Sequence, residues 1–262
     1  MGLNRPAATI QEFRRNLLRG SGHFSTEFQL RANVTFIIDK AARHPFMMFT
    51  KKHPDMIAEM DVFIELVEGK KCLIDIGAHY GIYSLAFTSL NPESSAYAIE
   101  PSPKCQKVLQ LNSKYNPELK IKPYQTAFGH NAGELCMHYE WVHLIADHSQ
   151  NNGAINTQLI SLSQFIEQEK IEPDVIKIDV DGYEGPVVEG SLAYLKDHDP
   201  LIFLELHGDW IRRYNYKPLD IAKMLSEVGY SFYSPKLQLI TDVESAFEIF
   251  ANRLICMKAG KK

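Results

Sequence analysis

The sequence contains few cysteines, no excess of basic residues and no long apolar run. Its four cysteines lie far apart and form no CxxC pair, so we expect reduced, buried thiols and not a zinc or redox site. The chain carries 28 basic and 32 acidic residues, a net charge of −4. It therefore lacks the basic surface typical of sequence-independent nucleic-acid binding, and we expect no nucleic-acid partner.

Sorting signals are also missing from the sequence. No apolar run approaches the length of a membrane span, so we predict none. The first twenty residues lack the apolar core of a signal peptide. Their arginines resemble those of a transit peptide, but Ile10, Phe13 and Leu17 share one face of an amphipathic helix, which we favour. The expected compartment is the cytoplasm.

Strands and helices alternate along most of the chain. Short apolar runs predict strands at Cys72–Ile76, Ala96–Glu100, Asp174–Val180 and Pro200–His207, with helical patterns between them. Continuous apolar runs are typical of a parallel sheet covered on both faces, which predicts an α/β fold. Two further strands near the end of the sequence are expected to form an antiparallel hairpin at one edge, joined by a short link.

The sequence divides into two predicted parts. Residues 1–70 are expected to form an N-terminal helical cap, because helical patterns run from about residue 8 to residue 70. Residues 71–262 form the predicted α/β domain. Within it, residues 138–153 read as a polar loop after a possible strand, whereas Ser102 and Ser161 are expected to cap helices.

A turn rich in small residues follows the first predicted strand. Gly77 and Gly81 allow the backbone to approach a ligand closely. Asp75 precedes this turn, and Glu100 ends the next strand, where an acid can accept hydrogen bonds from a ribose diol. A nicotinamide dinucleotide would favour GxGxxG, which is absent, and Asp75 would repel its pyrophosphate. S-adenosylmethionine fits better, because it has a sulfonium, an ammonium and a ribose diol.

Five motifs occur in one order between Cys72 and His207. They are "CLIDIGAHYGIYSLAF", "AIEPSPKCQKVLQLN", "TAFG", "VIKIDVDGYEGPVVEGSLAYL" and "PLIFLELHG". Together they resemble the FkbM-type methyltransferases. The resemblance implies a Rossmann-like class I methyltransferase with a mostly parallel seven-stranded sheet, which uses S-adenosylmethionine to methylate a hydroxyl of a sugar, glycan, polyketide or small metabolite.

The resemblance also implies which residues bind the cofactor. The residues expected around the methionine part are Asp75, Gly77, Ala78, His79 and Gly81, those at the ribose are Glu100, Pro101 and Ser102, and those near the adenine are Thr126 and Ala127. The chain departs from the family at two of its positions. His79 stands where the family often has asparagine, but both residues tolerate unusual backbone angles. Ser163 stands where the family often has aspartate, so no acid acts there.

Methyl transfer to a hydroxyl needs an aligned acceptor and a group that takes its proton. Asp179 ends a strand and is the leading candidate, while His207 ends the next strand and would share the side of Glu205 in a regular strand. One alternative is that some of Asp179, Asp181, Glu205 and His207 hold a hard cation such as Mg²⁺, which would lower the pKa of a hydroxyl. Asp181 and Glu184 fit helix capping as well as catalysis.

Alternatives remain for the loop and for the activity. Tyr139 and Trp141 could stack on a sugar ring, or the loop could serve as an exposed or oligomer contact; a homo-oligomer is compatible with the sequence. The acceptor partner is a small molecule or a glycan. The competing functions are a nicotinamide-dependent oxidoreductase or epimerase, and a non-catalytic binding module with a methyltransferase fold.

Overall fold

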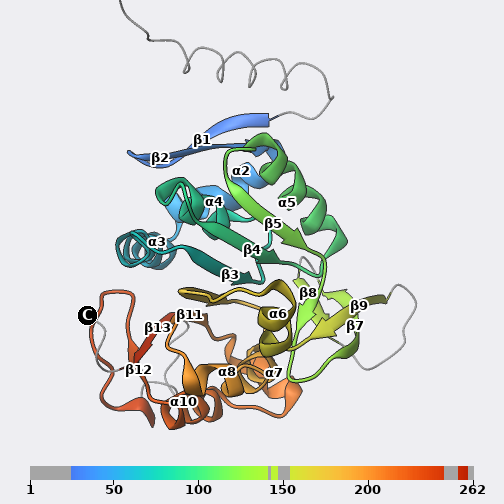
Figure 1. Ribbon diagram of the computed structural model, residues 1–262, viewed down its shortest axis with the longest axis vertical. Coiled ribbons are helices and arrows are strands. Elements are labelled where there is room, and N and C mark those ends of the chain that lie inside the picture. Colours follow the sequence, from blue (N-terminus) through green and yellow to red (C-terminus); the bar gives the residue numbers. More distant parts are fainter. Residues whose placement is uncertain (1–24, 141–142, 147–153, 245–252, 259–262) are drawn as a thin grey trace, which may run out of the picture.

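The computed structural model describes residues 25–140, 143–146, 154–244 and 253–258. They form a central seven-stranded sheet with helices on both faces, a small second sheet and an N-terminal hairpin (Figure 1). The amphipathic helix predicted within the first twenty residues lies outside the described part. Among the described residues, no helix is long and apolar enough to cross a membrane.

The central sheet is mostly parallel, as predicted, and has the order β12-β13-β11-β10-β3-β4-β5. Its strands are β3 (Cys72–Ile76), β4 (Ser95–Ile99), β5 (Lys120–Tyr124), β10 (Val175–Ile178), β11 (Leu201–Glu205), β12 (Tyr230–Tyr233) and β13 (Arg253–Lys258). Strand β13 runs antiparallel to both of its neighbours. From β3 the chain adds strands first on one side and later on the other, so strand order reverses between β3 and β10. Ligands of open α/β sheets bind at such a point.

Helices cover both faces of this sheet. One face carries α3 (Pro54–Leu66), α4 (Ile82–Leu90) and α5 (Pro103–Tyr115), and the other carries α6 (Leu162–Glu169), α7 (Glu184–Glu189), α8 (Leu192–Asp197) and α10 (Pro218–Glu227). Neighbouring strand residues alternate between the two apolar clusters: Leu73 and Val175 belong to one, and Ile74 and Ile176 to the other. Both faces are therefore buried, which explains the continuous apolar runs.

The prediction of a wholly helical N-terminal cap is wrong. Strands β1 (Ser25–Arg31) and β2 (Val34–Asp39) form an antiparallel hairpin, which is followed by α2 (Lys40–Met47), a π-helix η1 (Met48–Lys52) and α3. Alternate residues of the hairpin belong to one apolar cluster, and this period of two indicates strands: they are Phe28, Leu30, Val34, Phe36 and Ile38. The hairpin and α3 pack into the same apolar cluster as α4. A domain boundary near residue 70 stays a prediction.

A second sheet lies beside the carboxyl end of the central one, with the order β6-β9-β7-β8. Its strands are β6 (Ala127–Phe128), β7 (Gly133–Glu140), β8 (His143–Ala146) and β9 (Ile155–Ile160). The predicted strand in this region is confirmed as β7, whereas the predicted polar loop is wrong where β7 and β8 occupy it. Residues 141–142 and 147–153, with Trp141, lie outside the described part.

The two last strands pair antiparallel, as predicted, but not as a simple hairpin. Strand β13 inserts between β11 and β12, and residues 234–252 separate β12 from β13 along the chain. The predicted short link is therefore wrong. A short helix α9 (Gly208–Ile211) and a 3₁₀ turn η2 (Arg212–Tyr214) connect β11 to α10.

Candidate active site

A cavity of about 340 Å³ lies at the carboxyl ends of the central strands. Its position coincides with the reversal of strand order between β3 and β10, where a ligand is expected. The predicted cofactor residues that line it are Gly77, Ala78, His79, Glu100, Pro101, Ser102, Thr126 and Ala127. Asp75 and Gly81 are not among the lining residues.

The turn after β3 requires glycine for two different reasons. Gly77 has φ +79°, and a Cβ atom there would lie 1.7 Å from the carbonyl oxygen of Asp179. The backbone N–H groups of Gly77 and Ala78 both donate to the carbonyl of Ile99 at 2.9 Å. The turn therefore packs closely against the ends of both β4 and β10. His79 has φ +50°, which confirms the expectation that this position takes an unusual backbone angle.

Asp75 is buried beneath the turn and contacts α4. Its Oδ2 accepts hydrogen bonds from the Ser84 backbone N–H at 3.2 Å and from the Ser84 Oγ at 2.7 Å. Gly81 is the N-cap of α4 and has no side chain to satisfy the first N–H groups of the helix, so Asp75 does so from the strand. Burial raises the pKa of Asp75. Asp75 therefore connects the start of α4 to β3 through these hydrogen bonds.

Glu100 is a buried carboxylate at the end of β4 that lines the cavity. Its Oε2 accepts from the His79 N–H and its Oε1 from the Ser102 N–H, both at 2.8 Å. Burial raises the pKa of Glu100 to about 7, although these two donors act to lower it. Each oxygen has a second lone pair, so the carboxylate can accept further hydrogen bonds from a diol.

Ser102 links the residues around Glu100 to the second sheet. It caps α5, as predicted, because its Oγ accepts from the Cys105 N–H. The same oxygen lies 2.8 Å from the hydroxyl of Tyr139 on β7. Tyr139 is therefore engaged beside the Glu100 end of the cavity, and the ammonium of Lys104 lies 4.0 Å from the centre of its ring.

Lys177 is a buried charge that the sequence interpretation missed. It lies in β10 opposite Asp75 of β3, and its Nζ donates to Asp179 Oδ2 at 2.8 Å. Burial alone would raise the pKa of Asp179, but Lys177 and His207 lower it overall. A lysine inside an otherwise apolar strand, as in "VIKIDV", was the available signal, because a lysine is almost never fully buried unless it is paired.

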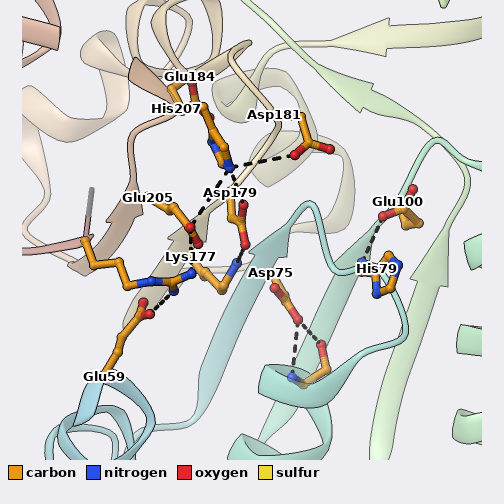
Figure 2. A network of polar contacts seen from close by, with 12 residues as sticks. Glu59, Asp75, His79, Glu100, Lys177, Asp179, Asp181, Glu184, Glu205 and His207 are labelled. Atoms are coloured by element: carbon orange, nitrogen blue, oxygen red, sulfur yellow. Dashed lines mark hydrogen bonds and ion pairs between the residues drawn. The ribbon is translucent and has the colours of Figure 1, made fainter. Parts of the chain in front are cut away.

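His207 lies at the centre of a group of acids beyond the ends of β10 and β11 (Figure 2). Its Nδ1 is 2.7 Å from Glu184 Oε1. Its Nε2 is 3.7 Å from Asp179 Oδ1, 3.7 Å from Asp181 Oδ1 and 4.0 Å from Glu205 Oε1. The structure thus brings together the three predicted catalytic residues, Asp179, Asp181 and His207.

Glu184 is fully buried at the start of α7 and orients His207. Its Oε1 also accepts from the backbone N–H of Gly182 at 3.0 Å, which fixes the carboxylate. Burial acts to lower the pKa of His207, but the hydrogen bond and charge of Glu184, with Asp179 and Glu205, raise it to about 9. Because Nδ1 is bound to the Glu184 carboxylate, Nε2 is the ring nitrogen that faces the other acids and the cavity.

Glu205 belongs to a second ionic chain that reaches the N-terminal helices. Arg253 Nη2 donates to Glu205 Oε1 at 2.6 Å, and Arg253 Nη1 binds the buried Glu59 of α3. Burial and Asp179 raise the pKa of Glu205, while Arg253 opposes that shift. As predicted, Glu205 lies on the same side of the strand as His207, with its Oε1 4.0 Å from His207 Nε2.

Three of the predicted metal ligands can share one cation. One ligand atom each from Asp179, Glu205 and His207 lies within 4.8 Å of the others. Asp181, the fourth predicted ligand, is not part of this group, although it contacts His207. Carboxylate and imidazole donors suit several divalent cations.

The sheet order and the cavity at its reversal point define a Rossmann-like α/β protein. Comparison with known families then shows to which family the protein belongs. Residues 75–232 match the family described as "Methyltransferase FkbM domain". The chain belongs to this family of S-adenosylmethionine-dependent methyltransferases. That membership displaces the alternative of a nicotinamide-dependent oxidoreductase or epimerase.

Individual proteins resemble the chain at lower identity. The hexuronic acid methyltransferase AglP of Haloferax volcanii is 25% identical over 188 residues, which cover 70% of this chain and 74% of AglP. The crystal structure of methyltransferase FkbM from Methylobacillus flagellatus shares 14% identity with a TM-score of 0.44. That match covers 71% of this chain but only 43% of the Methylobacillus chain. An S-adenosylmethionine-dependent methyltransferase from Agrobacterium tumefaciens shares 9% identity with a TM-score of 0.48, over 93% and 72% of the two chains.

Proposed function

We propose that the protein transfers a methyl group from S-adenosylmethionine to a hydroxyl oxygen of a sugar, glycan or small metabolite. The observation that carries this proposal is His207, whose Nδ1 is held by the buried Glu184 while its Nε2 faces the cavity. A histidine held in this way suits removal of a hydroxyl proton. Similarity to AglP, a hexuronic acid methyltransferase, supports a sugar acceptor.

The residues at the Glu100 end of the cavity fit the nucleoside part of the cofactor. Glu100 would accept hydrogen bonds from the ribose hydroxyls, while Thr126 and Ala127 would border the adenine. The bound cofactor supplies an electrophilic methyl group on a sulfonium. The turn at Gly77 and Ala78 presents its backbone to this part of the cavity.

The residues at the other end of the cavity would handle the acceptor. Asp179, the leading candidate from the sequence, pairs with Lys177, which lowers its pKa and makes it a weak base. His207 is the better proton acceptor, because Asp179 and Glu184 favour its charged form. In this mechanism His207 Nε2 would take the proton of the acceptor hydroxyl, and the cofactor would supply the methyl group by cleavage of its carbon–sulfur bond, which leaves S-adenosylhomocysteine. Asp181 and Asp179 then stabilise the imidazolium.

Binding of S-adenosylhomocysteine tests the cofactor end directly. We expect wild-type protein to bind it by calorimetry and Glu100→Gln to bind it about 10- to 100-fold more weakly, since the amide cannot accept at both positions. Wild-type affinity should fall as pH drops through about 7, where Glu100 becomes protonated. The control is Glu93→Gln, because Glu93 is exposed and pairs with Lys120 at the surface.

Two results would contradict this assignment. Equal affinity in wild type and Glu100→Gln would remove Glu100 from the ribose site. Absence of S-adenosylhomocysteine binding to the wild type would leave the non-catalytic module as the better interpretation. If binding occurs, a screen of monosaccharides, uronic acids and glycosides with radiolabelled S-adenosylmethionine identifies the acceptor class.

Chelation of divalent cations separates the two chemistries considered for the acid cluster. Lys177 already pairs with Asp179, and Arg253 with Glu205, so two of the three candidate ligands have their charge neutralised. We therefore expect methyl transfer to continue at the same rate in excess EDTA. Activity that disappears with EDTA and returns with Mg²⁺ would instead assign Asp179, Glu205 and His207 to a hard cation.

A further inference from the structure

One wall of the cavity is apolar and comes from the N-terminal part of the chain. This wall is formed within residues 45–56 by Pro45, Phe46, Met48, Phe49 and Met56. These residues precede the range that matches the family. Pro45, Met48 and Met56 are only half-buried, so each presents apolar surface beside the cavity. Apolar surface of this kind in a cavity marks a binding site for an apolar group.

Contacts place this wall at the acceptor end of the cavity. Met56 lies one helical turn before Glu59 on α3, and Glu59 binds Arg253 of the acid cluster. The ring of Phe49 packs edge-on against Tyr83, with centroids 5.6 Å apart. The ammonium of Lys177 lies 4.7 Å from the centre of the same Tyr83 ring.

The Glu100 end of the cavity lies away from Glu59. Figure 2 draws Glu59 to the left of Lys177 and Glu100 to the right. Glu100 instead contacts the turn at His79 and the start of α5 at Ser102. The part of the apolar wall on α3 therefore adjoins the groups proposed to take the hydroxyl proton.

The wall is held in a fixed shape by Arg31. Its guanidinium donates to the carbonyl oxygens of Phe49 at 3.0 Å and Ile57 at 3.1 Å, and its Nε lies 2.5 Å from Asp61 Oδ1. The first of these carbonyls belongs to the π-helix Met48–Lys52, a geometry that is frequent at functional sites. A surface held by such contacts loses little conformational freedom when it binds an apolar group.

We propose that the acceptor carries an alkyl group beside the hydroxyl that is methylated, as an alkyl glycoside does, and that Met48 and Met56 contact this group. The inference rests on the proposed function, because it names the acceptor class of the same site. One side of this acceptor end is charged, at His207 and Arg253, and the other is apolar. An acceptor with a polar and an apolar part matches both sides. Methionine side chains adapt well to such groups.

Binding of two uncharged sugars tests this inference without turnover. Hexyl β-glucoside, kept below its micelle concentration, and glucose are titrated into protein saturated with S-adenosylhomocysteine, and binding is followed by NMR. We expect wild-type protein to bind hexyl glucoside at least about 10-fold more tightly than glucose. The double variant Met48→Gln/Met56→Gln should lose this preference and keep its affinity for S-adenosylhomocysteine.

The matched control is Met47→Gln, because Met47 is also half-buried but does not line the cavity. It should keep the preference for hexyl glucoside. Equal binding of the two sugars by the wild type, or an unchanged preference in the double variant, would overturn the inference. If S-adenosylhomocysteine does not bind, the proposed function fails, and the same titrations without it still show whether Met48 and Met56 contact an alkyl group.

Discussion

Replacing His207 by glutamine should lower kcat by about 100- to 10,000-fold, the usual contribution of a general base. Glutamine keeps a polar side chain of similar size but cannot take a proton. Affinity for S-adenosylhomocysteine should change little, because His207 contacts acids and not Glu100. The measurement is single-turnover methyl transfer to whichever acceptor the screen identifies. A His207→Gln variant with wild-type rate would remove His207 from the chemistry.

The pH dependence of the wild type gives a second test of the same role. The pKa of His207 is raised to about 9, so the neutral base becomes more abundant as pH rises. We expect kcat/KM to increase with pH and to level off above about 9. In Glu184→Gln the pH at which kcat/KM levels off should shift toward the ordinary histidine value near 6.5, because the negative charge that raises the pKa of His207 is lost. If the pH dependence of kcat/KM did not shift in this variant, a group other than His207 would control it.

Replacing Gly77 by alanine should destabilise the fold by about 3–4 kcal/mol, from the left-handed backbone together with forced overpacking. The added Cβ would lie 1.7 Å from the Asp179 carbonyl oxygen, and backbone atoms cannot yield as a flexible side chain does. The midpoint of thermal unfolding should fall by about 10 °C. The ends of β3 and β10 would separate, so activity should fall further than the loss of folded protein explains.

Gly69 provides a matched control for this substitution. It has φ +75°, close to the +79° of Gly77, but a Cβ there would meet no atom within 4 Å. Gly69→Ala should therefore cost only about 1 kcal/mol, from backbone strain alone. Similar losses of folding stability in the two variants would show that backbone strain, and not the contact with Asp179, makes Gly77 necessary.

The sequence predicted the parts of the site that are close along the chain. The turn at Gly77, the cap at Ser102 and the acid at Glu100 follow from local rules about strand ends and helix starts. The strand interpretation also predicted that Glu205 and His207 would share a side, because side chains alternate along a strand.

The missed features depend on pairing between distant segments. Glu59 and Arg253 are 194 positions apart and meet only because β13 enters the sheet beside β11. No local pattern indicates such a contact. The N-terminal hairpin was missed for a different reason, because its strands alternate with a period of two that was read as part of a longer helical region.

The insertion of β13 between β11 and β12 has a consequence for folding. Strand β12 precedes β13 along the chain, yet within the described part of the central sheet it pairs with β13 alone. Until β13 enters the sheet, β11 presents an open edge. Arg253 arrives with β13, so Glu205 and Glu59 remain without their shared counter-charge until then. Slow docking of β13 would prolong exposure of an aggregation-prone edge.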